Sequence, residues 1–227
     1  MTSLFADTAD LAAARRLAPS VAGFTSNATL MRRAGVEDFR EFALTLISVA
    51  PDLPVSLGVL ADDPAEIAQQ ARVIAGWGEN VYVKVPVVNS HGESLMGVIA
   101  DLAREVRVNV TAVFTPEQAL AAGRALAGGR PGFVSVFAGR IADAGHDPES
   151  AVRQAVGTVE AVAPESRVIW ASTRQAFDIR RAQRCSCHAI TVAPELIAKH
   201  RARHRTLDEW TLDTARMFHR DAIGYSV

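Results

Sequence analysis

The sequence predicts a compact (β/α)8 barrel, which is a closed parallel sheet surrounded by helices. Short β-branched runs alternate with longer helical patterns along the whole chain, and this alternation is typical of repeated βα units. About eight such pairs in 227 residues leave no room for large insertions. The alternative is an open doubly wound sheet, but no Gly-x-Gly-x-x-Gly follows the first strand and no Gly-rich loop ends in Gly-Lys-Ser or Gly-Lys-Thr.

The expected strands are continuous apolar runs rather than alternating ones, as strands buried on both faces should be. In chain order they are residues 3–6, 21–24, 55–59, 81–85, 107–110, 133–137, 167–170 and 189–192.

Three helix starts are predicted from a capping side chain followed by proline and an early glutamate. They are Asp63-Pro64, Thr115-Pro116 and Asp147-Pro148. A further amphipathic helix is predicted at about 206–220, with apolar residues among charges: Leu207, Trp210, Leu212, Met217 and Phe218. We expect its apolar face to pack on its own barrel; the alternatives are docking on a neighbouring subunit or over the mouth of the barrel.

The composition is that of a soluble, nearly neutral protein. Hydrophobic residues make up 49%, and 24 basic residues nearly balance 25 acidic ones, so we expect neither disorder nor binding to nucleic acid or membrane. No apolar run approaches the roughly 20 residues of a membrane helix, and the first residues do not resemble a secretion signal. The expected location is the cytoplasm.

The cysteines lie in the segment Cys185-Ser186-Cys187-His188, which resembles half of a metal site. A tetrahedral zinc site needs a second ligand pair at usable spacing, and none accompanies this one. We therefore expect reduced thiols beside a buried strand and no bound metal.

Lys84 is the first indication of chemistry. Every other basic residue except Lys199 is arginine, and Lys84 lies inside the apolar run 81–87. A buried lysine can have a strongly lowered pKa, and its neutral amine is a nucleophile toward carbonyls, whereas arginine stays protonated. The alternative is a lysine paired with Asp7 or another inward carboxylate for structure alone.

Polar residues follow most of the predicted strands, at the barrel end where such enzymes carry their sites. Each alone also has a structural explanation. Asp7 could cap a helix starting at residue 8 or 9, Asn27 one through Leu30 and Ser172 one over residues 175–181, and Thr111 is a good strand former. The set comprises Asp7, Asn27, Lys84, Asn109, Thr111, Arg140, Ser172 and Arg174.

Six motifs in order carry a resemblance over nearly the whole chain. They are Phe5-Ala6-Asp7-Thr8-Ala9-Asp10, Gly23-Phe24-Thr25-Ser26-Asn27-Ala28-Thr29, Val83-Lys84-Val85-Pro86, Asn109-Val110-Thr111, Phe137-Ala138-Gly139-Arg140-Ile141 and Trp170-Ala171-Ser172. The chain resembles the transaldolase family, in its short branch that includes the fructose-6-phosphate aldolases. The resemblance implies one class I aldolase-type barrel domain over residues 1–227, acting without metal or organic cofactor.

The resemblance also assigns roles. Lys84 would form a Schiff base with the ketose C2 carbonyl, and Asp7 would be the general acid/base at the C4 hydroxyl, through a water held by Thr111. The dihydroxyacetone unit would be held by Asn27, Asn109 and Ser172, and the phosphate by Arg140 and Arg174. The partners would be a ketose phosphate donor and an aldose phosphate acceptor, in an expected homo-oligomer.

Two positions bear on the reaction. Phe137 resembles the transaldolases, since the aldolases carry tyrosine there. At Gly58 the sequence departs from the family's Glu or Gln, which leaves room for an additional water or part of a longer acceptor, unless Asp62 or Asp63 substitutes. The function implied is transfer of a dihydroxyacetone unit; the alternatives are an aldolase that releases or adds dihydroxyacetone and a non-catalytic sugar-phosphate-binding relative.

Overall fold

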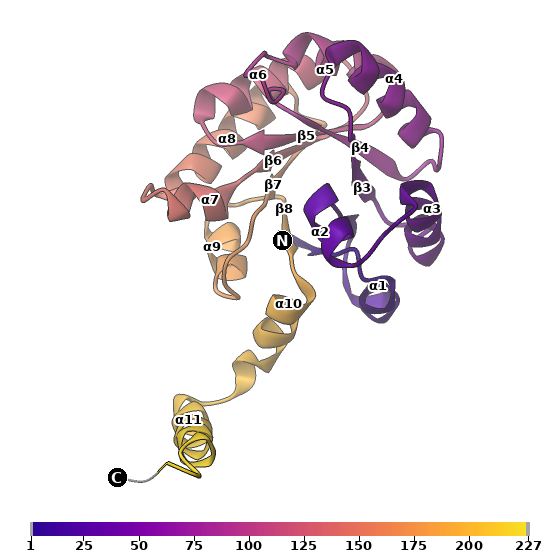
Figure 1. The fold of residues 1–227 in the computed structure, drawn as a ribbon. Helices are drawn as coiled ribbons and strands as arrows, with labels where there is room; N and C mark the ends of the chain where they lie inside the picture. The colour runs from indigo at the N-terminus through magenta and orange to yellow at the C-terminus, as the bar shows by residue number, and fades with distance from the viewer. Residues whose placement is uncertain (1, 226–227) are drawn as a thin grey trace.

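The computed structural model describes residues 2–225 and contains a closed barrel of eight parallel strands (Figure 1). Each strand pairs with the next in the chain, and β8 closes the sheet on β1, so the predicted (β/α)8 barrel is confirmed. The strands are β1 (Ser3–Asp7), β2 (Phe24–Thr25), β3 (Val55–Gly58), β4 (Val81–Pro86), β5 (Val108–Val113), β6 (Phe133–Val136), β7 (Arg167–Trp170) and β8 (Ala189–Val192).

Helices connect the strands and cover the outside of the barrel, and further helices follow the last strand. They are α1 (Leu11–Leu17), α2 (Ala28–Arg33), α3 (Phe39–Val49), α4 (Pro64–Ala75), α5 (Met96–Glu105), α6 (Pro116–Leu126), α7 (Ala138–Asp143), α8 (Pro148–Val162), α9 (Asp178–Arg184), α10 (Pro194–Arg201) and α11 (Leu207–Asp221). The three predicted caps are confirmed, because Asp63, Thr115 and Asp147 each accept a hydrogen bond from the first turn of their helix.

The second strand begins later than predicted and is only two residues long. Residues 21–24 were expected, but the chain before Phe24 bonds to β1 alone, with Ala22 N 2.7 Å from the Leu4 carbonyl oxygen. Bonding to the β3 side starts at Phe24. Gly23 fits there because a Cβ would come within 2.7 Å of the Phe5 ring.

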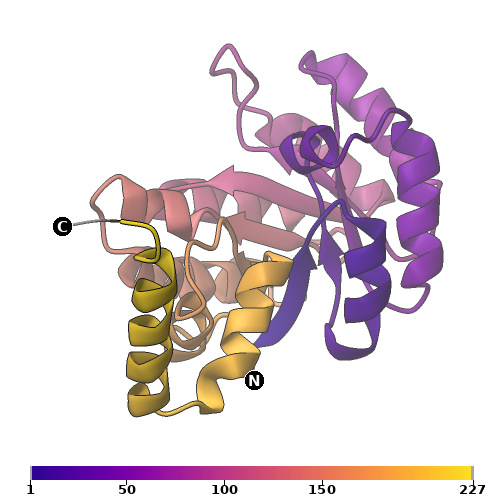
Figure 2. The same cartoon turned by 60° about the horizontal axis from the view of Figure 1, so that its bottom comes forward.

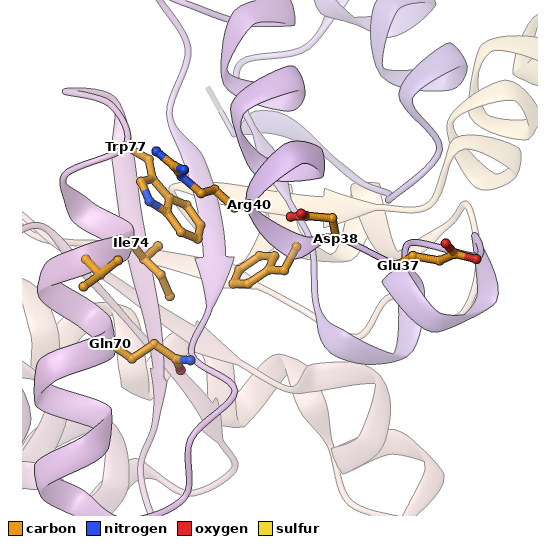
Figure 3. A pocket seen from close by; sticks show the side chains of 8 residues that line it. Glu37, Asp38, Arg40, Gln70, Ile74 and Trp77 are labelled. Carbon is orange, nitrogen blue, oxygen red and sulfur yellow. The ribbon is translucent and has the colours of Figure 1, made fainter.

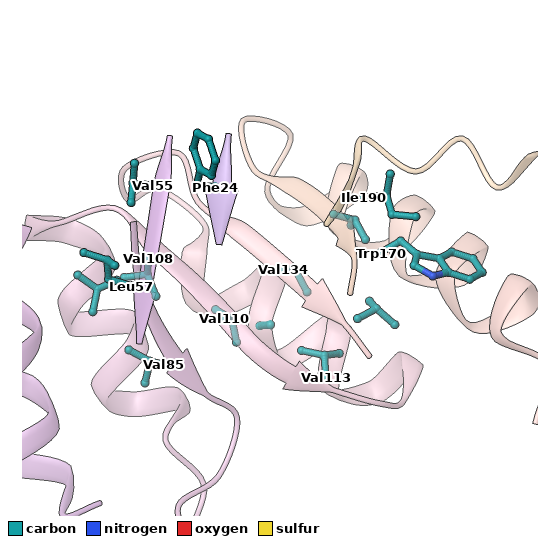
Figure 4. Packing of buried hydrophobic residues seen from close by; sticks show 14 of the residues in the cluster. Phe24, Val55, Leu57, Val85, Val108, Val110, Val113, Val134, Trp170 and Ile190 are labelled. Carbon is teal, nitrogen blue, oxygen red and sulfur yellow. The ribbon is translucent and has the colours of Figure 1, made fainter. Parts of the chain in front are cut away.

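The main core fills the space between the sheet and the helices, and the residues labelled in Figure 4 belong to it. A second, smaller cluster includes Phe5, Phe133 and Ile169, with Tyr82 packed against it. The rings of Tyr82 and Phe133 are 4.4 Å apart between centroids. These residues belong to the early and middle parts of their strands, so their side chains fill the barrel interior below the carboxyl ends.

The C-terminal helix forms but does not pack on its own barrel, so that expectation is wrong. None of the residues of α11 is buried, and Figure 1 shows this helix projecting away from the barrel. The turned view in Figure 2 shows α10 and α11 as the last two helices of the chain, outside the strand barrel. Trp210 and Phe218 remain 45% and 63% exposed.

Candidate active site

Lys84 lies in β4 and reaches across the neighbouring strand. Its Nζ donates a 3.0 Å hydrogen bond to the carbonyl oxygen of Ser26, which follows β2. Gly58 of β3 pairs with Lys84 in the sheet and has no side chain to block this path. Burial lowers the pKa of the Lys84 ammonium, and the charge of Asp7 opposes that effect. The amine is therefore easier to deprotonate than a lysine in water.

Asp7 ends β1 and is held by a neighbouring hydroxyl. Thr25 Oγ1 donates to Asp7 Oδ1 at 2.6 Å. Burial raises the pKa of the Asp7 carboxyl, while the Lys84 charge and the Thr25 hydrogen bond lower it. The capping alternative is wrong, because Asp10 caps α1.

The two charged groups influence each other without forming a direct ion pair. Lys84 and Asp7 have no N–O contact within 4 Å, and each has a different hydrogen-bond partner. The alternative in which Lys84 serves only as the direct ion-pair partner of Asp7 therefore does not fit this geometry.

Asn109 and Thr111 reach the same end of the barrel from β5. Asn109 is fully buried, donates to Ser56 Oγ at 3.0 Å and accepts from Ser135 Oγ at 2.7 Å. The Thr111 hydroxyl is buried without a protein partner, so it is available to bind a water or substrate hydroxyl. An irregularity in β5 follows, where Ala112 adopts a φ of 58°.

Asn27 and Ser172 lie in loops after β2 and β7. Asn27 Oδ1 caps α2 by accepting from Leu30 N at 3.0 Å, as its structural explanation predicts; the cap does not use the Asn27 Nδ2 donors. Ser172 does not cap a helix at Gln175, because α9 starts at Asp178. Its φ of 62° is rare for a non-glycine residue and is typical of functional loops.

Gly139 allows the loop after β7 to approach α7. A Cβ at this position would lie 1.6 Å from the Ser172 carbonyl oxygen and 3.0 Å from Arg174 Cγ. Arg140, next in the chain, places its guanidinium carbon 5.7 Å from the centroid of the Phe137 ring. The close approach brings the loop that carries Arg174 against α7, the helix that carries Arg140.

Arg174 forms an ion pair with Asp143. Its Nε and Nη2 donate to Asp143 Oδ2 at 2.9 and 2.5 Å, and both side chains are about half exposed. Asp143 occupies these two donors, so a phosphate bound by the same fork would have to compete with this carboxylate. The Arg174 backbone is fixed separately by its hydrogen bond to Asp178 Oδ2.

Neither Asp62 nor Asp63 replaces the side chain missing at Gly58. Asp63 caps α4, and Asp62 accepts from both the backbone and the hydroxyl of Ser90, at 2.8 and 2.6 Å. A Cβ at Gly58 would meet no other atom within 4 Å. The space beside Lys84 is therefore open, and neither aspartate is free to substitute.

The cysteines are free and buried. Cys187 contacts the Val168 and Ala189 carbonyl oxygens, and burial raises its pKa to about 12. Nearby, His188 accepts from Val168 N and faces Glu160. Within residues 2–225, no three His, Cys, Asp or Glu side chains are grouped to hold a metal ion.

Two hollows on the surface do not include the lysine site. One, of about 380 Å³, lies between the start of α3 and α4 and is lined by Phe39, Ile74 and Trp77 among others (Figure 3). The other, of about 690 Å³, lies between α1 and α3. Neither is lined by Lys84 or Asp7, so the site is located by the chemistry of its residues rather than by the size of a hollow.

Sequence reasoning missed four hydroxyl residues around these groups. They are Thr25, Ser56, Ser135 and Thr191, each at most 5% exposed and each bonded to another polar side chain. Ser56 and Ser135 are each a single serine inside an otherwise apolar strand, which is a signal that could have identified them. Thr25 and Thr191 carry no such signal, because threonine is common in strands.

Fold and site together define a (β/α)8 barrel with a desolvated lysine and a partnered carboxylate at the carboxyl ends of its strands. Residues 4–223 match the family model described as Transaldolase/Fructose-6-phosphate aldolase. The chain belongs to this family of enzymes, which confirms the resemblance.

Relatives support this assignment. A probable transaldolase of Dehalococcoides mccartyi is 37% identical over 173 residues, 76% of either chain. One of Desulforudis audaxviator is 34% identical over 217 residues, 91% of this chain and 96% of the relative. Among solved structures, thiamine phosphate pyrophosphorylase from Pyrococcus furiosus shares the fold with a TM-score of 0.57 and 15% identity, covering 84% of this chain and 85% of that one.

No helix within the described residues is long and apolar enough to cross a membrane.

Proposed function

We propose that this protein transfers a dihydroxyacetone unit from a ketose phosphate to an aldose phosphate through a Schiff base on Lys84. The observation that carries the proposal is the inward lysine of β4, whose burial lowers the pKa of its amine while Asp7 lies within electrostatic range. The neutral amine attacks the C2 carbonyl of the donor, and water leaves as the imine forms. No metal or organic cofactor enters these steps.

In this mechanism the protonated imine accepts the electron pair of the C3–C4 bond. Asp7 takes the proton of the C4 hydroxyl as that carbon becomes an aldehyde and leaves. The enamine that remains on Lys84 attacks the acceptor aldehyde, Asp7 returns the proton, and water releases the product. Thr111 holds the water between Asp7 and the sugar, since its buried hydroxyl has no protein partner.

The remaining residues bind the sugar phosphates. Asn27, Asn109 and Ser172 contact the hydroxyls of the dihydroxyacetone unit, and Phe137 lines the site. Arg140 and Arg174 bind the phosphate. The reaction takes place in the cytoplasm, where the free thiols Cys185 and Cys187 stay reduced.

The test is borohydride reduction with fructose 6-phosphate, followed by intact mass and peptide mapping. Reduction converts the imine to a stable secondary amine, so an adduct on Lys84 supports the proposal. No adduct with a range of ketose phosphates, or one on Lys199, would reject it. Assaying free dihydroxyacetone beside the transfer product separates transferase from aldolase, and trapping without either product would indicate a binding relative.

Arg174→Ala should weaken reaction with a phosphorylated donor selectively. Loss of one charged, multiply bonded contact costs about 1.5 to 3 kcal/mol, or roughly 10- to 100-fold in kcat/KM for fructose 6-phosphate. Fructose should be affected much less. Arg72→Ala is the matched control, because Arg72 is also 48% exposed and bonds Glu105 through Nε and Nη2. Equal losses for both donors would make Arg174 structural.

Gly58→Glu tests what the open space beside Lys84 accommodates. We propose part of an acceptor longer than a triose or tetrose phosphate, so the variant should suppress transfer to pentose phosphates and spare glyceraldehyde 3-phosphate. Gly157→Glu, in α8 with open space around its Cβ, controls for the added charge. Preserved or faster transfer to every acceptor would instead mean that the space holds only water.

We also propose that the protein is a homo-oligomer in which α11 docks on a second copy. Leu207, Trp210 and Phe218 recur at helical spacing on α11 and are all exposed, so they are available to a neighbour. A chain ending at residue 205 should sediment as a smaller species than the full chain. A monomeric full-length chain would contradict this assembly.

A further inference from the structure

Two threonine hydroxyls lie one behind the other next to Asp7. Thr25 comes from β2 and Thr191 from β8, which are the two strands that flank β1 in the barrel. Thr25 Oγ1 lies 2.6 Å from Asp7 Oδ1 and 2.6 Å from Thr191 Oγ1. The two threonines are 1% and 5% exposed, so water does not compete freely for these bonds.

The number of hydrogens available fixes the direction of these two hydrogen bonds. Each hydroxyl has a single hydrogen to donate. When Asp7 is ionised it only accepts, so the Thr25 hydrogen points to Asp7. Thr25 Oγ1 must then accept from Thr191. The carboxylate is thus stabilised by one direct hydrogen bond from Thr25, and Thr191 polarises that bond by donating to Thr25 Oγ1.

The same two hydrogen bonds can also form when Asp7 is protonated. A proton on Oδ1 can be donated to Thr25 Oγ1, whose own hydrogen then turns to Thr191. Both charge states of the carboxyl keep a bonded partner, and the 2.6 Å contacts remain hydrogen bonds in either direction. Nothing has to move except hydroxyl hydrogens. This property suits a group that gains and loses a proton in each turnover.

We infer that Thr25 and Thr191 are positioning residues that hold the Asp7 carboxyl in place and set the pH at which it ionises. The inference rests on the proposed function only in taking Asp7 as the acid/base. Thr191 is itself held, because Thr173 Oγ1 donates to its carbonyl oxygen at 2.6 Å. The hydroxyl pair is therefore anchored to the loop that follows β7.

Other groups also act on the pKa of Asp7. Burial raises its pKa and Lys84 on β4 lowers it, as does the Thr25 hydrogen bond; Glu195 on α10 raises it. Removing the Thr25 hydroxyl leaves burial, Lys84 and Glu195 in place and deletes one stabilising contact to the carboxylate. Because a hydrogen bond to the charged carboxylate is stronger than one from the neutral acid, the pKa of Asp7 should rise.

The experiment is a carbon-13 NMR titration of protein labelled at the aspartate carboxyl carbons. The Asp7 resonance is the one that Asp7→Asn removes. Thr25→Val, which keeps the shape and deletes the hydroxyl, should raise the Asp7 midpoint by about one pH unit or more. Thr191→Val should raise it by less. Thr25→Ser and Thr191→Ser should return it toward the wild-type value.

Ser135→Ala is the matched control. Ser135 is also a buried hydroxyl in a barrel strand, 2% exposed, but its partner is Asn109. Its loss should leave the Asp7 midpoint unchanged. The inference is overturned if Thr25→Val and Thr191→Val leave the midpoint where it is, or if Ser135→Ala moves it equally. If Thr25→Val does not fold, Thr191→Val decides alone.

A kinetic arm separates this inference from the proposed function. The acid limb of kcat/KM for fructose 6-phosphate should move upward with the NMR midpoint. Wild-type protein that neither traps an imine nor turns over would reject the proposed function, while the NMR titration would still decide the role of the hydroxyls. Normal wild-type turnover with unmoved midpoints would reject only the hydroxyl pair.

Discussion

Lys84→Arg should fold and lose transfer activity by on the order of 10⁴-fold or more, together with the borohydride adduct. The substitution keeps a positive charge and a long side chain, but the guanidinium stays protonated and cannot attack a carbonyl. Removal of a covalent nucleophile has effects of this size in other enzymes. Steady-state assays and intact mass after reduction measure the two losses, and thermal unfolding checks the fold.

Lys199→Arg is the control, because Lys199 is the other lysine of the chain and lies near the end of α10. It should retain both activity and adduct. The pH dependence adds a second check. Because burial lowers the pKa of Lys84, the rate of trapping should rise with pH through a midpoint below 10.5, the ordinary value. A midpoint at the ordinary value would mean that Lys84 is solvated.

The strand order was predictable because strands buried on both faces appear as uninterrupted apolar runs. Their ends were less predictable. The β2 boundary depends on Phe5 packing over Gly23, a contact between two different βα units. The extension of β5 to Val113 depends on the irregular pairing with β6 at Ala112. Neither feature can be recognised from the hydrophobic pattern of the strand's own residues.

The candidate site was predictable where a residue type is unusual for its surroundings. Lys84 in an apolar run is such a case, and so are polar residues directly after strands. Thr25 and Thr191 are not, since threonine is common in strands. Their importance arises from the barrel closing β8 onto β1, which brings hydroxyls 166 positions apart to 2.6 Å.

The docking of α11 could not be decided from the sequence for a similar reason. An amphipathic pattern predicts that a face will be buried, but it does not identify the surface that covers it. The helix formed where expected, with a capping box between Thr206 and Glu209, while its apolar face stayed exposed. Local signals specified the helix, but they do not identify the surface that would cover its apolar face.

Asp7→Asn should separate the two halves of the reaction. Cleavage of the C3–C4 bond should slow by roughly 100-fold or more, because the amide cannot accept the C4 hydroxyl proton. Imine formation should survive. The amide oxygen that the substitution introduces can still accept the hydrogen bond from Thr25, so this contact is kept in the variant.

The effect of the Asp7 charge on Lys84 gives Asp7→Asn a second expected result besides slower cleavage. The Asp7 charge raises the pKa of Lys84, so neutralising Asp7 lets that pKa fall further and increases the fraction of neutral amine at about pH 7. Trapping of dihydroxyacetone by borohydride, which needs no bond cleavage, should therefore be as fast as in the wild type or faster, while single-turnover cleavage of fructose 6-phosphate is slow. Trapping and cleavage that fall together would make Asp7 a structural partner of the site, and so would a variant that unfolds but keeps full activity per folded molecule.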